Sequence, residues 1–186
     1  MILEQHNPKW LLEFERLKYV YVQTLGEFIV GIEHVGSTAV SGLMAKPIID
    51  IDIVIQNYDV FPTITKRLGT LGYYHNGDQG VFQREAFKRK DAKVPYYTSE
   101  KDWMLHHLYV CPKFSMELKR HILFRDVLKS DQQIRDQYEK MKTNIAERSG
   151  NDRKKYADIK EVECKDFIYS VINDAENGVY TRHDIN

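Results

Sequence analysis

The chain has 186 residues, of which 42% are hydrophobic and 29% charged, with 10 glycines and 5 prolines. This composition excludes a disordered chain, and the length suits one well-buried core better than two independent domains. Lysine and arginine number 27, and aspartate and glutamate also number 27, so no net charge favours strong binding to nucleic acid or to an anionic membrane.

The N-terminal residues and the two cysteines predict a cytoplasmic protein. The opening residues, MILEQHNPKW, lack the apolar stretch of a secretory signal, and no later segment offers the roughly 18 uncharged apolar residues of a membrane span. Cys111 and Cys164 lie far apart and form no CxxC pair. This spacing argues against a disulfide framework and against a structural zinc site.

The first half of the chain predicts alternating helices and strands. Asn7 followed by Pro8 is typical of a helix start, and Gly26 of a helix end. Periodicity predicts a helix that begins at Asn7 and Pro8 and runs to Leu25. Periodicity and turn residues then predict strands at 28–35 and 48–55, a helix at 59–71, a hairpin turn at 77–80 and its returning strand at 81–88.

The second half begins with a charged segment, 88–101, which contains Pro95 and has no sustained periodicity. We expect a mobile loop there, and a candidate lid. The remaining predicted elements are a strand at 103–111 and helices at 115–128, 131–148, capped by Ser130 and Gln133, and 152–175.

Together these elements predict an α/β protein of the α+β type, with a mixed sheet and helices on one of its faces. We expect one domain over residues 1–176, in which 1–112 form the sheet core with the site and 113–176 form a helical part. Residues 177–186 are expected to be a loose tail.

Two carboxylates share one face of the strand at 48–55, which reads IIDIDIVI. Because side chains alternate along a strand, Asp50 and Asp52 point to one side and the alternate isoleucines to the other. Their backbones lie roughly 6.6 Å apart, from a rise of ~3.3 Å per residue, so both can bind one or two Mg²⁺ ions. The alternative is an amphipathic strand whose aspartates simply face water.

The loop before that strand favours the metal site. In the segment GSTA, the absence of a side chain at Gly36 and the hydroxyls of Ser37 and Thr38 allow close approach to a phosphate. Lys46 can reach an anion held at the same place, although a lone loop lysine is more often solvated. Phosphate donors and metal ligands are therefore expected to adjoin.

Histidines offer a competing hypothesis, a zinc site built from His34, His106 and His107. Adjacent residues of a strand point to opposite faces, so His106 and His107 cannot easily bind one ion. A zinc hydrolase is therefore disfavoured.

The segment EHVGSTAVSGLMAKPIIDIDI closely resembles the signature of the GrpB family, whose members have a nucleotidyltransferase-like fold. The resemblance extends from Trp10 to Phe167. It implies that Gly36 and Ser37 contact nucleotide phosphates and that Asp50 and Asp52 bind the metals. Further matches are HHLYV at 106–110, FRDVL at 124–128, Tyr138 with Lys142, and Tyr156 with Lys160.

For activity, the resemblance implies attack of a hydroxyl on the α-phosphate of a nucleoside triphosphate, aided by Mg²⁺ or Mn²⁺, with pyrophosphate leaving. The superfamily's third carboxylate has no counterpart, and His107 stands at its expected position as a candidate base or phosphate contact. The alternatives are a module that binds a nucleotide or coenzyme A-like molecule without turnover, and a purely structural protein. The expected partner is a nucleotide or a similar small molecule, and a homodimer is left open.

Overall fold

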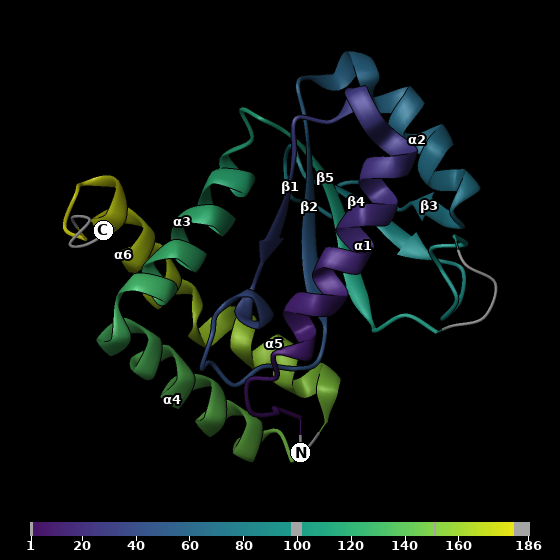
Figure 1. Cartoon of the computed structure of the whole chain (residues 1–186). Helices are drawn as coiled ribbons and strands as arrows, with labels where there is room; N and C mark the ends of the chain where they lie inside the picture. The colour runs from purple at the N-terminus through teal and green to yellow at the C-terminus, as the bar shows by residue number, and fades with distance from the viewer. Residues whose placement is uncertain (1, 98–101, 151, 181–186) are drawn as a thin grey trace.

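A mixed sheet of five strands organises the molecule, in the order β1-β2-β5-β4-β3 (Figure 1). The computed structural model describes residues 2–97, 102–150 and 152–180. β2 and β5 are parallel, and the other neighbouring pairs are antiparallel. The strands are β1 (Gly31–Val35), β2 (Ile49–Ile55), β3 (Tyr73–His75), β4 (Glu85–Arg89) and β5 (His106–Pro112).

Helices lie on both sides of this sheet (Figure 1). One side carries α1 (Lys9–Leu25) and α2 (Phe61–Thr70), and the other carries the helical part, which is α3 (Met116–Ser130), α4 (Gln132–Arg148), α5 (Arg153–Glu163) and α6 (Lys165–Glu176). Short 3-10 turns occupy Gly26–Phe28, Ser37–Ala39 and Tyr58–Val60. Among the described residues, no helix combines the length and apolar character that crossing a membrane requires.

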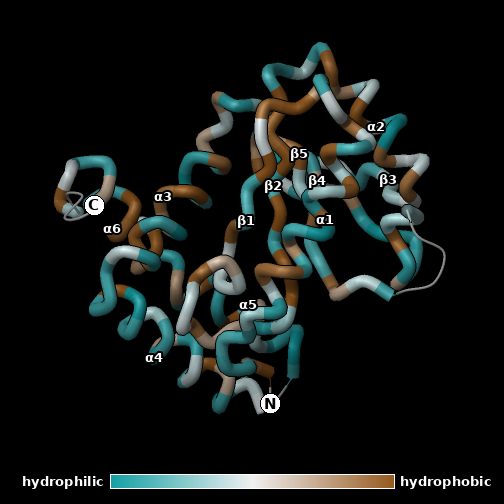
Figure 2. Tube along the Cα trace, viewed as in Figure 1, coloured by the Kyte–Doolittle hydropathy of each residue, from teal (hydrophilic) through white to brown (hydrophobic). Residues whose placement is uncertain are grey.

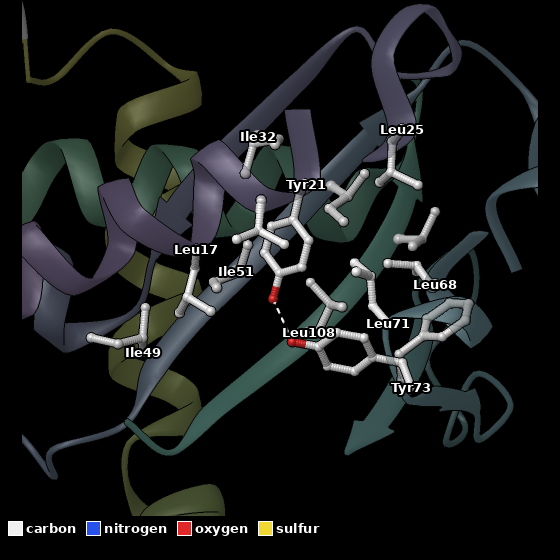
Figure 3. Close-up of a cluster of buried hydrophobic side chains, with 14 of the residues drawn as sticks. Leu17, Tyr21, Leu25, Ile32, Ile49, Ile51, Leu68, Leu71, Tyr73 and Leu108 are labelled. Carbon is white, nitrogen blue, oxygen red and sulfur yellow. Dashed lines mark hydrogen bonds between the residues drawn. The ribbon is translucent and has the colours of Figure 1, made fainter. Parts of the chain in front are cut away.

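The main core lies between the sheet and the pair α1 and α2 (Figure 3). The alternation predicted for β2 is confirmed, because Ile49, Ile51, Ile53 and Ile55 are all fully buried there. α4 lies farther out and is coloured mainly as hydrophilic in Figure 2, in keeping with its three buried side chains, Tyr138, Lys142 and Ile145. The sequence pattern therefore fixes which face of β2 is left for polar chemistry.

A chain of buried polar groups crosses this core. The hydroxyls of Tyr21 and Tyr73 lie 2.7 Å apart (Figure 3), and the Tyr73 hydroxyl contacts Nε2 of His106. His106 donates from Nδ1 to the Met104 carbonyl at 2.8 Å, so its Nε2 accepts from Tyr73. Burial lowers the pKa of His106 to about 3, which keeps the ring neutral. These hydrogen bonds between Tyr21, Tyr73 and His106 connect α1, β3 and β5.

Replacing Tyr73 with phenylalanine is expected to reduce the free energy of unfolding by about 1–3 kcal/mol, because it leaves His106 and Tyr21 buried without their partner. Urea melts measure this loss. Tyr74→Phe is the matched control, since Tyr74 is exposed and is expected to change stability by less than about 0.5 kcal/mol. Equal effects of the two substitutions would contradict a role for the buried chain.

Several predicted boundaries need correction. The helix expected over 152–175 is two helices, α5 and α6, which meet at Cys164. The first strand begins at Gly31, after a 3-10 turn. α4 is capped by Asp131, whose side chain accepts from the Ile134 N–H at 3.0 Å, and not by Ser130 and Gln133. The predicted hairpin is present as the antiparallel pair β3 and β4, but its returning strand begins at Glu85 and not at residue 81. Periodicity continues across such breaks, so it does not locate them.

The charged segment expected to be a lid packs mainly away from the cavity described below. Val94 is fully buried in the main core, and Trp103 donates to the Pro95 carbonyl at 3.0 Å. None of the described residues between 88 and 97 lines the cavity, and residues 98–101 lie outside the described part of the chain. The buried side chain of Val94 and the hydrogen bond from Trp103 to Pro95 therefore hold this segment against the core, although it is rich in charged residues.

Candidate functional site

A cavity of about 850 Å³ lies between the sheet and the helical part. Its volume is typical of small-molecule sites. Residues from the loop after β1, from β2 and β5, and from all four C-terminal helices line it. Of the candidate site residues assigned from the sequence, Asp52 does not line the cavity, and those on its wall are Gly36, Ser37, Thr38, Lys46, Asp50 and His107.

Asp50 lies where the loop and two strands meet. On β5 its neighbour in register is His107, whose Nδ1 lies 2.9 Å from Asp50 Oδ1. A Cβ built at Gly36 would lie 2.3 Å from Asp50 Oδ2, and the φ of Gly36 is +70°. Any larger residue at that position would therefore displace either the loop or the carboxylate. The predicted proximity of Gly36, Asp50 and His107 is present.

Asp52 lies on the same face of β2 but is fully buried beneath α3. His121, on α3, places Nδ1 2.7 Å from Asp52 Oδ2 and Nε2 3.3 Å from Glu117 Oε1. Burial opposes protonation of His121, but the bonds and charges of the two carboxylates outweigh it and raise its pKa to about 10. A protonated imidazole thus compensates the charge of Asp52.

The carboxylates have a feature that suits a cation. Asp52 Oδ1 is buried and has no hydrogen-bond partner among the described residues, which is costly for a charged oxygen. In the described part of the chain, no group of three or more His, Cys, Asp or Glu side chains is arranged to hold a metal. Mg²⁺ commonly takes only one or two carboxylates and completes its shell with water and phosphate oxygens. The pair therefore fits a cation that arrives with a phosphate ligand.

Three lysines, which we call the lysine cluster, also line the cavity: Lys46, Lys142 and Lys160. Lys142 is 1% exposed and places Nζ 3.2 Å from Ser37 Oγ. Lys46 lies over the Tyr156 ring at 4.2 Å, and Lys160 lies 5.8 Å from the Tyr138 ring centre. No described carboxylate lies within 4.0 Å of any of the three ammonium groups. The cluster therefore offers positive charge to an anion.

Thr38 lies on the cavity wall, but its hydroxyl is already engaged. It donates to the Ile48 carbonyl at 3.1 Å and lies 3.1 Å from His34 Nε2. His34 stacks on Phe14, and burial lowers its pKa to about 4. Thr38 and His34 thus hold the loop against β2, and Ser37 carries the hydroxyl that faces the cluster.

The structure adds site residues that sequence reasoning did not assign. His121 and Glu117 are far from Asp52 in sequence, and nothing in their spacing indicates the contact. Lys142 and Lys160 stood in the segments that resemble GrpB, without a role. Arg125, in the FRDVL segment, donates to Glu33 at 2.6 Å and to the His34 carbonyl at 3.1 Å, which fastens α3 to β1.

Comparison with known proteins places these residues in a family context. The profile of the family described as GrpB protein matches residues 1–172. The glutamate-rich protein GrpB of Alkalihalophilus pseudofirmus is 31% identical over 175 residues, which cover 94% of this chain and 95% of that protein. The UPF0157 protein YqkA of Bacillus subtilis is 30% identical over 76% of this chain and 38% of its own length.

Solved structures agree with the expected fold. The crystal structure of conserved protein GrpB from Enterococcus faecalis matches with a TM-score of 0.76 at 24% identity, over 96% of this chain and 99% of that one. The Cid1 poly(U) polymerase with bound MgGTP matches with a TM-score of 0.53 at 10% identity, over 78% of this chain and 45% of that one. The mixed α/β, nucleotidyltransferase-like fold predicted from the sequence is confirmed.

Proposed function

We propose that this chain, which belongs to the GrpB protein family, transfers a nucleoside monophosphate from a nucleoside triphosphate to a hydroxyl acceptor. The observation that carries the proposal is the Asp52 carboxylate, whose buried Oδ1 has no hydrogen-bond partner among the described residues. Asp52 shares its face of β2 with Asp50, and Asp50 in turn lies against Gly36. A cation bound by this carboxylate would supply the missing partner, and the loop at Gly36 would bring a phosphate beside it.

The donor's phosphates are assigned to the loop and the lysine cluster. Gly36 allows the backbone close to Asp50, and the Ser37 hydroxyl faces Lys142. Lys46 and Lys160 add charge at the same end of the cavity, where no described carboxylate pairs with them. A triphosphate is the common ligand whose charge suits both this cluster and a carboxylate-bound cation.

Asp50 and Asp52 would hold Mg²⁺ or Mn²⁺, which when bound neutralises charge on phosphate oxygens. His107 holds Asp50 through its 2.9 Å contact, and His121 holds Asp52 through its 2.7 Å contact. These histidines fix the carboxylates in position before substrate arrives, which reduces the cost of ordering them during the reaction.

The acceptor hydroxyl attacks the α-phosphorus while the bond from that phosphorus to the bridging oxygen breaks. The electron pair of that bond stays with the departing pyrophosphate, and the hydroxyl proton passes to water. The chain's own residues bind the triphosphate, orient it and keep its anionic end out of bulk solvent. This positioning is the main contribution that a protein makes to phosphoryl transfer.

A second candidate is a module that binds a nucleotide or a coenzyme A-like molecule without turnover. The specific observation in its favour is that the described residues contain no cluster of three potential metal ligands, where active nucleotidyltransferases present three carboxylates. In that case the same groups hold the phosphates, but no acceptor is attacked.

A nucleotide panel tests the proposal. With Mg²⁺ or Mn²⁺, at least one nucleoside triphosphate is expected to raise the melting temperature, and the same triphosphate in EDTA is expected to raise it much less. Release of pyrophosphate is then measured for each triphosphate without an added acceptor, so that water takes the place of the acceptor hydroxyl. Stabilisation by triphosphate or by coenzyme A without any release favours the binding module. No cation-dependent stabilisation by any nucleotide would reject the site altogether.

A further inference from the structure

Lys142 differs from the other two members of the lysine cluster, because α4 carries it into contact with Ser37 in the loop after β1. Its Nζ donates to the Met44 carbonyl and lies 3.2 Å from Ser37 Oγ. Glu139, one turn earlier on α4, accepts from the Met44 N–H at 2.7 Å. The helix thus binds both the N–H and the carbonyl of Met44, and Lys142 is held beside Ser37.

The surroundings of Lys142 are poor in compensating charge. Burial, followed by repulsion from Lys160, lowers its pKa to about 7, and the influence of Glu139 only partly offsets this. The charged and titratable groups that face it are Lys160 on α5, Glu139 and Tyr138 on α4, and Cys164 between α5 and α6. Near pH 7 and without a ligand, the Lys142 amine is therefore present in both its charged and its neutral form.

We propose that Lys142 takes up a proton as a polyphosphate binds and donates that proton to the pyrophosphate as it leaves. This inference rests on the proposed transfer function and adds a catalytic residue to it. The oxygen that bridged the α- and β-phosphates receives the electron pair of the broken bond and the proton from Nζ. Lys142 is left as a neutral amine, which its surroundings tolerate, and regains a proton from water with the next triphosphate.

Position singles out Lys142 for this role. It contacts Ser37, the hydroxyl assigned to the phosphates, whereas Lys46 lies over Tyr156 and donates to the Arg153 carbonyl at 3.4 Å. A polyphosphate beside Lys142 supplies the negative charge that its site lacks and so favours the ammonium form. When pyrophosphate departs, that stabilisation departs with it, so giving up the proton costs little.

Binding provides a test that does not require turnover. Calorimetric titration of Mg²⁺-pyrophosphate at pH 8, repeated in buffers of different ionisation enthalpy, measures protons taken up on binding. Wild type is expected to take up about one proton more than Lys142→Met, because most Lys142 amines are neutral at that pH before binding. Lys140→Met, at an exposed position of the same helix, is the matched control and is expected to match wild type. Equal uptake by wild type and Lys142→Met would overturn the proposal, as would a failure of pyrophosphate to bind wild type.

Leaving-group chemistry tests the donation itself. Lys142→Met is expected to lower the rate of pyrophosphate release from a triphosphate by roughly 100-fold, the lower end of typical acid catalysis. The deficit is expected to shrink with a β,γ-difluoromethylene triphosphate, whose leaving group needs a proton less, and to persist in Lys142→Arg, which keeps the charge but holds its proton. Near-UV circular dichroism confirms that each variant is folded.

The outcomes separate the two proposals. Equal deficits with both donors would overturn the role of Lys142 as an acid and leave the transfer function standing. If wild type releases pyrophosphate from none of the triphosphates in the panel, the transfer function fails and the donation step fails with it, whatever the calorimetry shows.

Discussion

Replacing Asp52 with asparagine is expected to abolish cation-dependent nucleotide binding and to lower the free energy of unfolding by about 3–5 kcal/mol. Asp52 is fully buried, and its Oδ2 is 2.7 Å from His121 Nδ1. An asparagine leaves the partly buried His121 with only Glu117 as a charged partner, and removing one member of a pair whose other carboxylate is buried costs more than removing both members. Urea melts in EDTA measure the stability change, and thermal shift with triphosphate and Mg²⁺ measures binding.

Asp50→Asn is the matched comparison on the same strand. The side chain of Asp50 is 30% exposed and that of its partner His107 is 50% exposed, so this pair is well screened by water. We expect a stability change within about 1 kcal/mol and an equal loss of cation dependence. A site that is only structural gives a different result, in which Asp52→Asn loses stability but neither variant changes nucleotide binding.

Lys142 is expected to make the stability of the ligand-free protein rise with pH between about 7 and about 10. Its pKa in the folded protein is lowered to about 7 from its ordinary value of 10.5, mainly by burial. Between these values the unfolded chain holds a proton that the folded chain lacks, so each step up in pH favours folding, with a limiting slope of about 1.4 kcal/mol per pH unit. The contribution is complete above the unfolded value and is lost as the pH falls to the folded one.

Lys142→Met isolates this effect from other groups that titrate in the same range. The variant is expected to be more stable than wild type at pH 7, and the difference between the two proteins is expected to narrow or reverse by pH 10. Lys140→Met is expected to follow the wild-type curve. Parallel curves for wild type and Lys142→Met would show that Lys142 titrates normally in the folded protein and would also weaken its role as a proton donor.

The sequence by itself determined the polar and apolar faces of β2 and the loop that accompanies it. Alternation over seven residues leaves one register that buries the isoleucines, so Asp50 and Asp52 had to share the other face. Gly36 and Ser37 lie beside that strand because they directly follow Val35, which pairs with Asp50 in the antiparallel register. Local patterns also gave the fold class and most helices, since amphipathic periodicity depends on nearby residues only.

Only the tertiary structure decided how the two aspartates differ. His121 comes from α3 and Lys142 from α4, and their contacts with Asp52 and Ser37 join residues 69 and 105 positions apart in sequence. No period or motif links such pairs, because their proximity follows from how the helical part packs on the sheet. Burial and neighbouring charges then set the protonation states that the sequence leaves open. His121 is protonated beside Asp52, and the pKa of Lys142 is lowered to about 7.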